Sequence, residues 1–358
     1  MEYSEFFDQG LSTWMQQDGP DSDVVISSRI RLARNIANIS FSPLMTEQVT
    51  EELLARVQSV VGSQSFRELG DYQMIRIKDL DPLERRILVE KHLISPRLSD
   101  DFQHSAVILK DDESANVMLN EEDHLRIQCI YPGLQLQKGF QLANQIDDAI
   151  EQTVEYAFDE KLGYLTSCLT NVGTGLRASA MLHIPALVIT GQVKRLISAI
   201  QRVGLAVRGY YGEGSEAAGN IFQISNQLTL GLNEEEILEN LEDVIKQIIE
   251  HERDARKNLL HHSKAQLEDK IFRSLGILAY ARVISTQEAM ERISDIRLGI
   301  DLGMIDGVSC NILKELMVLM GTGFMQRHAG RELTAEERDS KRASLIRERL
   351  CNYNIEKS

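Results

Sequence analysis

The segment 166–180, TSCLTNVGTGLRASA, places a thiol, a glycine-rich turn and a guanidinium between Cys168 and Arg177. A cysteine close to cations and a glycine turn has a lowered pKa, so its thiolate can attack a substrate or face a cationic group. The backbone amides of the turn, together with the arginine, can instead hold an anion such as phosphate. The third interpretation is an inert buried cysteine before an ordinary turn, which is the commoner case for a lone cysteine.

Four further arginines stand beside expected strands or glycine turns, as Arg177 does. Arg29 and Arg31 in SSRIR are two residues apart, so on a strand both side chains point to one face. Arg126 follows the acidic cluster NEEDH, and Arg208 precedes the glycine-rich stretch GEGSEAAG. Guanidinium groups bind phosphate oxygens bidentately, so one shared triphosphate accounts for all five arginines. The alternative is that each arginine is a strand-edge residue paired with a nearby carboxylate.

The glycine-rich stretches do not match the common nucleotide-binding signatures. The sequence contains no GxxxxGK[ST] phosphate loop. GEGSEAAG at 212–219 is weak evidence for a dinucleotide site, because no strand–helix–strand unit is expected around it. If ATP binds, arginine side chains and loop amides must therefore hold it.

Three acidic residues complement these cations. Glu121 and Glu122 are adjacent at the start of an expected strand, and Glu213 lies in the second glycine-rich stretch. Solvated loop charges are one interpretation. The other is a cationic substrate, because a pair of carboxylates orients a guanidinium and can accept its proton while its nitrogen attacks phosphorus. No accompanying His–Asp arrangement is evident for covalent catalysis by Cys168.

The composition bounds the class of protein. The chain has 358 residues, 43% hydrophobic and 26% charged, which suits a globular protein of two domains. Its net charge of -15 argues against a nonspecific nucleic-acid partner. The four cysteines are far apart, which favours a reducing compartment over a disulfide framework. We expect no signal peptide and no membrane span, and we predict a cytoplasmic location.

The elements that must position these residues read as α+β. Residues 21–36 predict a strand that runs into an arginine-bearing turn, and 46–61 predict a helix from the spacing of their apolar residues. Residues 105–133 predict a hairpin followed by a third strand, and 134–158 a helix. Because the strands of 163–224 adjoin one another, we expect an antiparallel sheet flanked by helices.

The pattern changes near residue 232. Asn233 and Glu236 form a capping box that starts a long helix with an apolar stripe, and almost every later segment looks helical. We predict a mixed catalytic domain at 1–231 and an all-helical regulatory and dimerisation domain at 232–358.

Four segments carry a resemblance to a known family. In order, SSRIRLARN, NEEDHLRI, CLTNVGTGLRAS and RGYYGEGSEAAGNIFQISN resemble the signature segments of the ATP:guanidino phosphotransferases, or phosphagen kinases. The match covers roughly 20–230 and implies transfer of the γ-phosphoryl group of ATP to a guanidinium. SSRIR begins at residue 27, so we expect no long N-terminal domain closing over a free amino acid. With the helical region that follows, the chain is similar to the branch that phosphorylates arginines on proteins.

The resemblance implies a role for each matching residue. Glu122 corresponds to the catalytic base, Glu213 to a second guanidinium-binding carboxylate and Cys168 to a substrate-facing thiolate, with Glu121 supporting Glu122. The implied ATP-binding positions are Ser27, Ser28, Arg29, Ile30, Arg31, His92, Arg126, Arg177, Ala178, Ser179, Ala180, Met181, Arg208, Gly209, Tyr210, Tyr211 and Gly212.

Beside these matches stand a histidine, an implied metal ion and one departure from the family's pattern. His92 taken alone reads as a structural histidine, and the resemblance alone makes it an ATP contact. Mg²⁺ is implied, bound mainly by nucleotide phosphates and water, so we expect no separate metal site made of protein ligands. Leu169 stands where relatives commonly carry proline, which bears on the shape of the cysteine loop.

The C-terminal segment 333–350 starts with a capping box and predicts a helix. Arg338 and Arg342 are four residues apart and share a face, with Asp339 beside them. A solvated charged face is the simple interpretation. RDSKRA, which ends at Ala343, also resembles the RDxxRA motif of the protein-phosphorylating branch. That similarity implies a second, regulatory pocket for phosphoarginine.

The resemblance also implies partners. It predicts protein substrates with accessible arginines, which are marked for a Clp ATPase and protease in a stress response. It further predicts a zinc-finger activator protein and a homodimer or higher oligomer. Two alternative functions stay open, a kinase for free arginine and a phosphoarginine-binding adaptor without turnover. The expected lack of a closure domain weighs against the first, and the intact Glu122, Glu213 and Cys168 weigh against the second.

Overall fold

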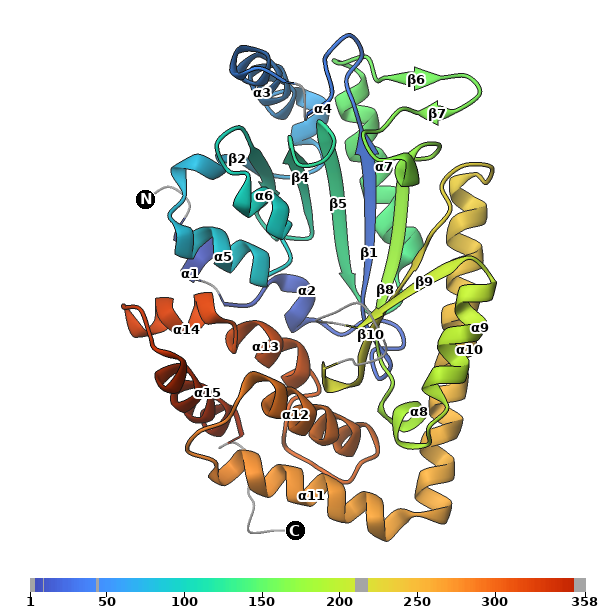
Figure 1. Cartoon of the computed structure of the whole chain (residues 1–358), viewed down its shortest axis with the longest axis vertical. Helices are drawn as coiled ribbons and strands as arrows, with labels where there is room; N and C mark the ends of the chain where they lie inside the picture. Colours follow the sequence, from blue (N-terminus) through green and yellow to red (C-terminus); the bar gives the residue numbers. More distant parts are fainter. Residues whose placement is uncertain (1–3, 9, 43–44, 210–217, 351–358) are drawn as a thin grey trace.

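The computed structural model describes residues 4–8, 10–42, 45–209 and 218–350. In this part of the chain, eight strands form one antiparallel sheet in the order β2-β3-β4-β5-β1-β8-β10-β9 (Figure 1). The strands are β1 (Val25–Arg34), β2 (Tyr72–Arg76), β3 (Ala106–Lys110), β4 (Ala115–Leu119), β5 (Leu125–Pro132), β8 (Leu176–His183), β9 (Leu205–Gly209) and β10 (Ile221–Asn226). A separate hairpin pairs β6 (Phe158–Asp159) with β7 (Gly163–Tyr164). The predicted α+β class is confirmed.

One face of the sheet packs on the first of two hydrophobic cores. The helices that contribute to this core are α3 (Glu47–Val61), α4 (Gln64–Arg67), α7 (Leu136–Glu151), α8 (Pro185–Ile189), α9 (Val193–Arg202) and α10 (Glu234–His262). Strand residues such as Ile30 and Leu32 on β1 are fully buried against them. Because side chains alternate along a strand, Arg29 and Arg31 project from the opposite face.

The second core lies on the other side of the sheet and involves the remaining helices. These are α1 (Ser4–Asp8), α2 (Thr13–Gln16), α5 (Pro82–Glu90), α6 (Pro96–Asp100), α11 (Lys264–Tyr280), α12 (Thr286–Asp301), α13 (Ile312–Leu319), α14 (Thr322–Ala329) and α15 (Ala335–Leu350). Figure 1 shows α11 to α15, in orange to red, gathered below the sheet, with α1, α2 and α5 next to them. The C-terminal helices therefore pack on the side of the sheet from which Arg29 and Arg31 project.

The capping boxes predicted for two helices are confirmed. The Asn233 side chain accepts from the Glu236 amide and the Glu236 carboxylate accepts from the Asn233 amide, which fixes the start of α10. The same pair of bonds joins Thr334 and Glu337 at the start of α15. The domain division at 231/232 stays a prediction, because α10 packs its apolar stripe into the first core with the sheet. No helix of the described residues is long and apolar enough to cross a membrane.

Candidate active site

Strands at the centre of the sheet bring the predicted arginines together. In the ladder, Arg31 on β1 lies opposite Gln128 on β5 and Arg177 on β8. Residues that face each other across an antiparallel ladder share a face, so these three side chains form a polar row. Two residues along β1, Arg29 lies opposite Ser179 of β8, and this pair forms the next polar row on the same face.

These arginines have few anionic partners. Arg29 donates from Nη2 to Gln223 Oε1 at 2.9 Å, and Arg177 donates from Nη2 to the hydroxyl of Ser225 at 3.3 Å. Both acceptors are uncharged. The Nε atoms of Arg31 and Arg177 are buried without a hydrogen-bond partner in the described structure. A group of half-buried cations whose hydrogen-bond acceptors are neutral is a site for a polyanion.

The electrostatics support the same conclusion. Burial, together with the charges of Arg177 and Arg126, lowers the pKa of Arg29 to about 10. Burial and the neighbouring arginines also lower the pKa of Arg31 well below its usual value. Burial, followed by the charges of Arg208 and Arg126, lowers the pKa of Arg177. Each guanidinium is destabilised by the others, so bound phosphate oxygens would relieve a repulsion already present.

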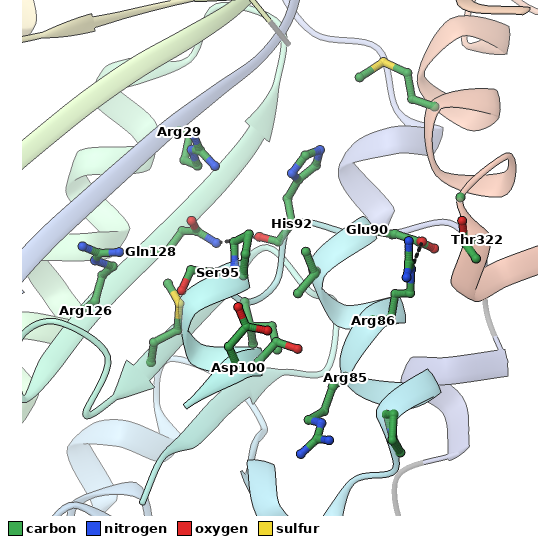
Figure 2. Close-up of a pocket in the computed structure, with 18 of the residues that line it drawn as sticks. Arg29, Arg85, Arg86, Glu90, His92, Ser95, Asp100, Arg126, Gln128 and Thr322 are labelled. Carbon is green, nitrogen blue, oxygen red and sulfur yellow. Dashed lines mark hydrogen bonds and ion pairs between the residues drawn. The ribbon is translucent and has the colours of Figure 1, made fainter. Parts of the chain in front are cut away.

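A cavity of about 890 Å³ opens over this polar face (Figure 2). Figure 2 shows Arg29, Arg126 and Gln128 on the strands, with His92 and Ser95 between them and Thr322 on α14 at the far side. The volume is that of a pocket for a ligand of nucleotide size. The cavity therefore lies between the sheet, the segment that contains α5 and α6, and the C-terminal helices.

His92 sits deep in this region with an unusual backbone. Its φ of 61° lies in the left-handed region, and its carbonyl accepts a hydrogen bond of 2.8 Å from Gln128 Nε2. Burial and the charge of Arg29 lower the pKa of His92 to about 4. The imidazole is therefore neutral at physiological pH, and it borders a narrow extension of the site with Ser27, Ser179 and Met181.

The two adjacent glutamates have different environments. The Glu121 side chain is 3% exposed and pairs with Arg126 Nη1 at 2.7 Å. It also accepts from Ser95 Oγ at 2.6 Å and from the Glu122 amide at 2.9 Å. Both carboxylate oxygens of Glu121 therefore have partners inside the protein, which makes it a positioning residue for Arg126 and Glu122.

Glu122 instead faces a cavity. Its side chain is 27% exposed, and Oε2 pairs with Arg126 Nη2 at 3.1 Å. Arg97 Nη1 lies 3.8 Å from Oε1, beyond hydrogen-bond distance, so this oxygen can accept from a ligand. Glu122 lines a cavity of about 230 Å³ together with Cys168, Asn171 and Arg126. A carboxylate and a thiol thus face one small space at the edge of the arginine cluster.

Asp123 holds the loop that carries Cys168. Its Oδ1 accepts from Asn35 Nδ2 at 2.7 Å and from the backbone amide of Ser167 at 2.6 Å. The thiol of Cys168 then lies 3.0 Å from the hydroxyl of Thr170. The sequence does not predict this role of Asp123, although the residue lies within the NEEDH cluster. Its partners are remote in sequence, so spacing carried no signal for it.

The glycines after Cys168 permit close backbone contacts. Gly173 has φ +113°, and a Cβ there would meet the carbonyl oxygen of Thr229 at 2.1 Å. A Cβ on Gly175, with φ +65°, would meet the carbonyl oxygen of Ala33 at 2.6 Å. Thr229 also donates from Oγ1 to the carbonyl of Thr170 at 2.9 Å. Because both glycines lack a Cβ, the backbone of the cysteine loop can lie in close contact with β1 and with the segment after β10.

Four predicted ATP-contact positions point their side chains away from the cavity. The Ser28 hydroxyl donates to the Gly133 carbonyl at 2.7 Å and accepts from the Gln135 amide at 2.9 Å. The other three are buried in the first core, namely Ile30, Ala178 and Ala180. Such residues shape the strands, while their alternating neighbours supply the side chains that face the cavity.

The second glycine-rich stretch is partly outside the described residues. Arg208 and Gly209 lie on β9, where Arg208 is opposite Gln223. The remaining predicted positions there fall outside the described residues, namely Tyr210, Tyr211, Gly212 and Glu213. In the described residues, no group of three or more His, Cys, Asp or Glu side chains is arranged to hold a metal ion.

The predicted C-terminal motif lies on α15 and binds its own chain. Arg342 is 3% exposed and donates from Nη1 to the Ile284 carbonyl at 2.7 Å and to Asp339 at 2.5 Å. Arg338 donates from Nη1 to the Leu333 carbonyl at 2.9 Å. Ala343 is buried behind them. The Nε atom of Arg342 is buried without a hydrogen-bond partner in the described structure.

Two family models match the chain. The ATP:guanido phosphotransferase C-terminal catalytic domain matches residues 52–255. The protein-arginine kinase McsB C-terminal domain matches residues 264–358. The first match contains the acidic cluster, the cysteine loop and most of the arginines, and the second contains the motif on α15.

Curated relatives match over nearly the full length. A protein-arginine kinase of Geobacillus sp. (strain WCH70) is 54% identical over 350 residues, which cover 98% of this chain and 97% of the relative. A protein-arginine kinase of Halalkalibacterium halodurans is 55% identical, and 98% of each chain is covered.

Among solved structures, the fold resembles those of guanidino kinases. A lombricine kinase crystal structure matches with a TM-score of 0.57 and 23% identity, covering 67% of this chain and 70% of the other. The duplicated taurocyamine kinase from Schistosoma mansoni also matches with a TM-score of 0.57, at 22% identity over 76% of this chain and 42% of the other.

Proposed function

The chain belongs to the ATP:guanido phosphotransferase family, whose members are transferases, and we propose that it transfers the γ-phosphoryl group of ATP to arginine side chains of proteins. The family resemblance expected from the four signature segments is confirmed. The observation that carries the proposal is the cavity where Glu122 and Cys168 meet the edge of the arginine cluster. One half of this site suits a polyphosphate and the other suits a guanidinium.

The arginines account for ATP binding. Arg29, Arg31 and Arg177 lack carboxylate partners among the described residues and repel one another, so a triphosphate satisfies them. The neutral His92 suits the uncharged end of the nucleotide. Mg²⁺ would be held mainly by the phosphates and water, and it would neutralise charge on the transferring group.

The carboxylates account for the guanidinium. In the proposed step, a guanidinium nitrogen attacks the γ-phosphorus, the bond to the bridging oxygen breaks, and ADP leaves. Glu122 accepts the proton lost by that nitrogen, while the thiolate of Cys168 faces the cation. Glu213 would supply the second carboxylate. Transfer depends mainly on positioning and charge stabilisation, which the packed loop provides.

The direct test offers purified protein and Mg-ATP to free arginine or to an unfolded, arginine-rich protein. Products are identified by mass spectrometry without acid steps, because a phosphoramidate is acid-labile. We expect phosphate on protein arginines and none in the Glu122→Ala control. Phosphate on free arginine alone would make the chain a small-molecule kinase, and binding of phosphoarginine without any transfer would make it an adaptor.

The resemblance also supports finer proposals about the cellular role. We propose that phosphorylated proteins are passed to a Clp ATPase and protease during stress in the cytoplasm, with a zinc-finger protein as activator. We also propose that the active form is a homodimer or higher oligomer. The test measures how fast a reconstituted Clp protease degrades the same substrate with and without arginine phosphorylation. Equal degradation rates would contradict the marking role.

The motif on α15 supports a proposal for regulation. Arg338 and Arg342 would grip the phosphoryl group of a phosphoarginine and Asp339 its guanidinium, so the product would stimulate the kinase or its assembly. Binding requires Asp339 to leave Arg342, to which it is bonded in this structure. We expect Arg338→Ala with Arg342→Ala to lose phosphoarginine binding, measured by calorimetry. Unchanged binding, basal activity and oligomeric state would contradict the regulatory pocket. Arg338→Ala alone tests the pocket without removing the buried Arg342.

A further inference from the structure

Exposed apolar side chains gather around the loop that carries Cys168. Among the described residues, five such side chains belong to three segments near this loop, and we name them the apolar rim. Their exposed fractions are 57% for Phe158, 46% for Leu162, 87% for Leu169, 57% for Leu228 and 52% for Leu230. Single exposed apolar residues are normal on a protein surface, but a group beside a reactive site marks a place of contact.

Backbone contacts join the three segments. The amide of Tyr164 on β7 donates to the carbonyl of Gly173 at 2.8 Å, which attaches the β6–β7 hairpin to the cysteine loop (Figure 1). Phe158 pairs with Tyr164 across this hairpin, and their rings lie 5.3 Å apart. On the other side, Thr229 donates to the carbonyls of Thr170 and Val172. Leu228 and Leu230 flank Thr229 in sequence, so the rim borders the loop from two directions.

The segments that carry the apolar rim are held in place by buried side-chain contacts. The guanidinium of Arg34 lies 3.5 Å from the ring centre of Tyr164 and pairs with Asp147 at 2.7 Å, with both charged side chains almost fully buried. The Thr229 side chain is buried as well. Leu169 follows Cys168 directly and still exposes most of its surface. The apolar groups are thus presented to solvent by a packed scaffold.

We propose that the apolar rim binds apolar side chains that flank the target arginine. The inference rests on the proposed function. An arginine that reaches Glu122 and Cys168 enters a cavity of about 230 Å³ lined by the cysteine loop. Its main chain must then cross the surface next to that loop, where the rim lies.

The charge around the rim fits this occupant. Asp159 and Glu160 lie exposed in the turn between Phe158 and Leu162, beside the exposed Lys161, and Glu235 is exposed close after Leu230 in sequence. Acidic groups beside an apolar surface favour a segment with a positive side chain among apolar ones. The surface is therefore assigned to substrate.

The test compares two flexible peptides with one arginine each, flanked by glycine and serine in one and by leucine and phenylalanine in the other. We expect the apolar peptide to have a KM about tenfold lower, the effect of one partly buried leucine-sized side chain. In Phe158→Ser with Leu230→Ser, the two KM values should converge. Val283→Ser is the matched control, because Val283 is 62% exposed but lies in the C-terminal helical region. Its KM ratio should equal that of the wild type.

Each other outcome has a distinct meaning. Equal KM values for the two peptides in the wild type would contradict the proposed role of the apolar rim. So would an unchanged ratio of these KM values in a rim variant whose unfolding temperature equals that of the wild type. Loss of self-association in that variant with the ratio retained would show an interface between copies. If free arginine accepts phosphate and neither peptide does, the proposed function fails. Leu169→Ser repeats the comparison with the most exposed member of the rim.

Discussion

Glu121 and Glu122 are adjacent in sequence, but burial separates their roles. The Glu121 carboxylate accepts hydrogen bonds from Arg126, Ser95 and a backbone amide. Glu122 has one oxygen without a close hydrogen-bond partner and lines the cavity that also contains Cys168. The same functional group thus positions a neighbour in one place and can accept a substrate proton in the next.

This difference predicts opposite kinetic effects for matched variants. Glu122→Gln removes the proton acceptor, so kcat should fall by about 10²–10⁴-fold while the Kd for ATP stays near that of the wild type. Glu121→Gln weakens the pairing with Arg126, so it should raise the KM for ATP and keep more of kcat. Steady-state kinetics and nucleotide titration measure both quantities. Near-normal turnover in Glu122→Gln would exclude it as the base.

Cys168 should contribute to substrate alignment rather than to covalent chemistry. Cys168→Ser keeps a polar group of similar size but replaces the sulfur that we propose faces the substrate cation. We expect kcat/KM for the arginine substrate to fall about tenfold, equivalent to about 1.4 kcal/mol, with ATP binding unchanged. Full activity in the serine variant would show that Cys168 only fills the loop.

At the scale of elements, the alternation of strand residues divides the SSRIR segment into two functions. Arg29 and Arg31 face the cavity, whereas Ile30 faces the first core. Ser28 joins β1 to the chain at Gly133 and Gln135 just before α7. A motif that reads as one ATP-binding segment thus contains residues that hold the sheet to its covering helix.

Ser28 therefore predicts a change in stability. Ser28→Ala leaves a buried carbonyl and a partly buried amide without their partner, so the free energy of unfolding should fall by about 1–3 kcal/mol. The KM for ATP should remain within about twofold, because this hydroxyl faces away from the cavity. Chemical denaturation and kinetics measure the two effects. Ser198→Ala on the exposed face of α9 is the control, whose unfolding free energy should be nearly unchanged. A raised KM without loss of stability would return Ser28 to the ATP site.

The expected domain boundary illustrates a limit at the same scale. Secondary structure becomes helical near residue 232, where the boundary was predicted. In the structure, α10 packs with the sheet through Ile237, Leu241 and Ile245. Side chains of the second core, in contrast, begin again at Leu267 on α11. A change in secondary structure and a change in packing partner occur at different residues, about one long helix apart.

At the scale of the whole molecule, buried polar groups join the sheet to the C-terminal helices. His183 at the end of β8 lies 2.8 Å from the hydroxyl of Ser294 on α12, which also accepts from Asn220 at 2.8 Å. Burial, together with the charges of Arg256 and Arg297, keeps the pKa of His183 well below its usual value. The folded state therefore favours the neutral imidazole.

This contact predicts a loss of stability in acid. The unfolded chain binds a proton at His183 below about pH 6.5 and the folded chain does not, so the free energy of unfolding falls as pH falls through that value. The limiting slope is about 1.4 kcal/mol per pH unit for one group. Urea denaturation between pH 7.5 and 5 should show a smaller slope for His183→Gln than for the wild type. Asp301, whose pKa burial raises to about 6, has the opposite sign but is present in both proteins. Equal slopes would exclude His183.

The sequence by itself determined the chemistry of the site and the elements around it. The arginines, the acidic cluster and the cysteine loop are recognisable from residue types and short spacings, and caps and apolar periods are local properties of the chain. Tertiary structure alone decided which strands adjoin, with β1 between β5 and β8. That order places Arg31 next to Gln128 and Arg177. Other long-range contacts give Glu121 and Glu122 different partners, bring Asp123 to the cysteine loop and gather the apolar rim. Such contacts join residues far apart in the chain, so neither spacing nor composition reports them.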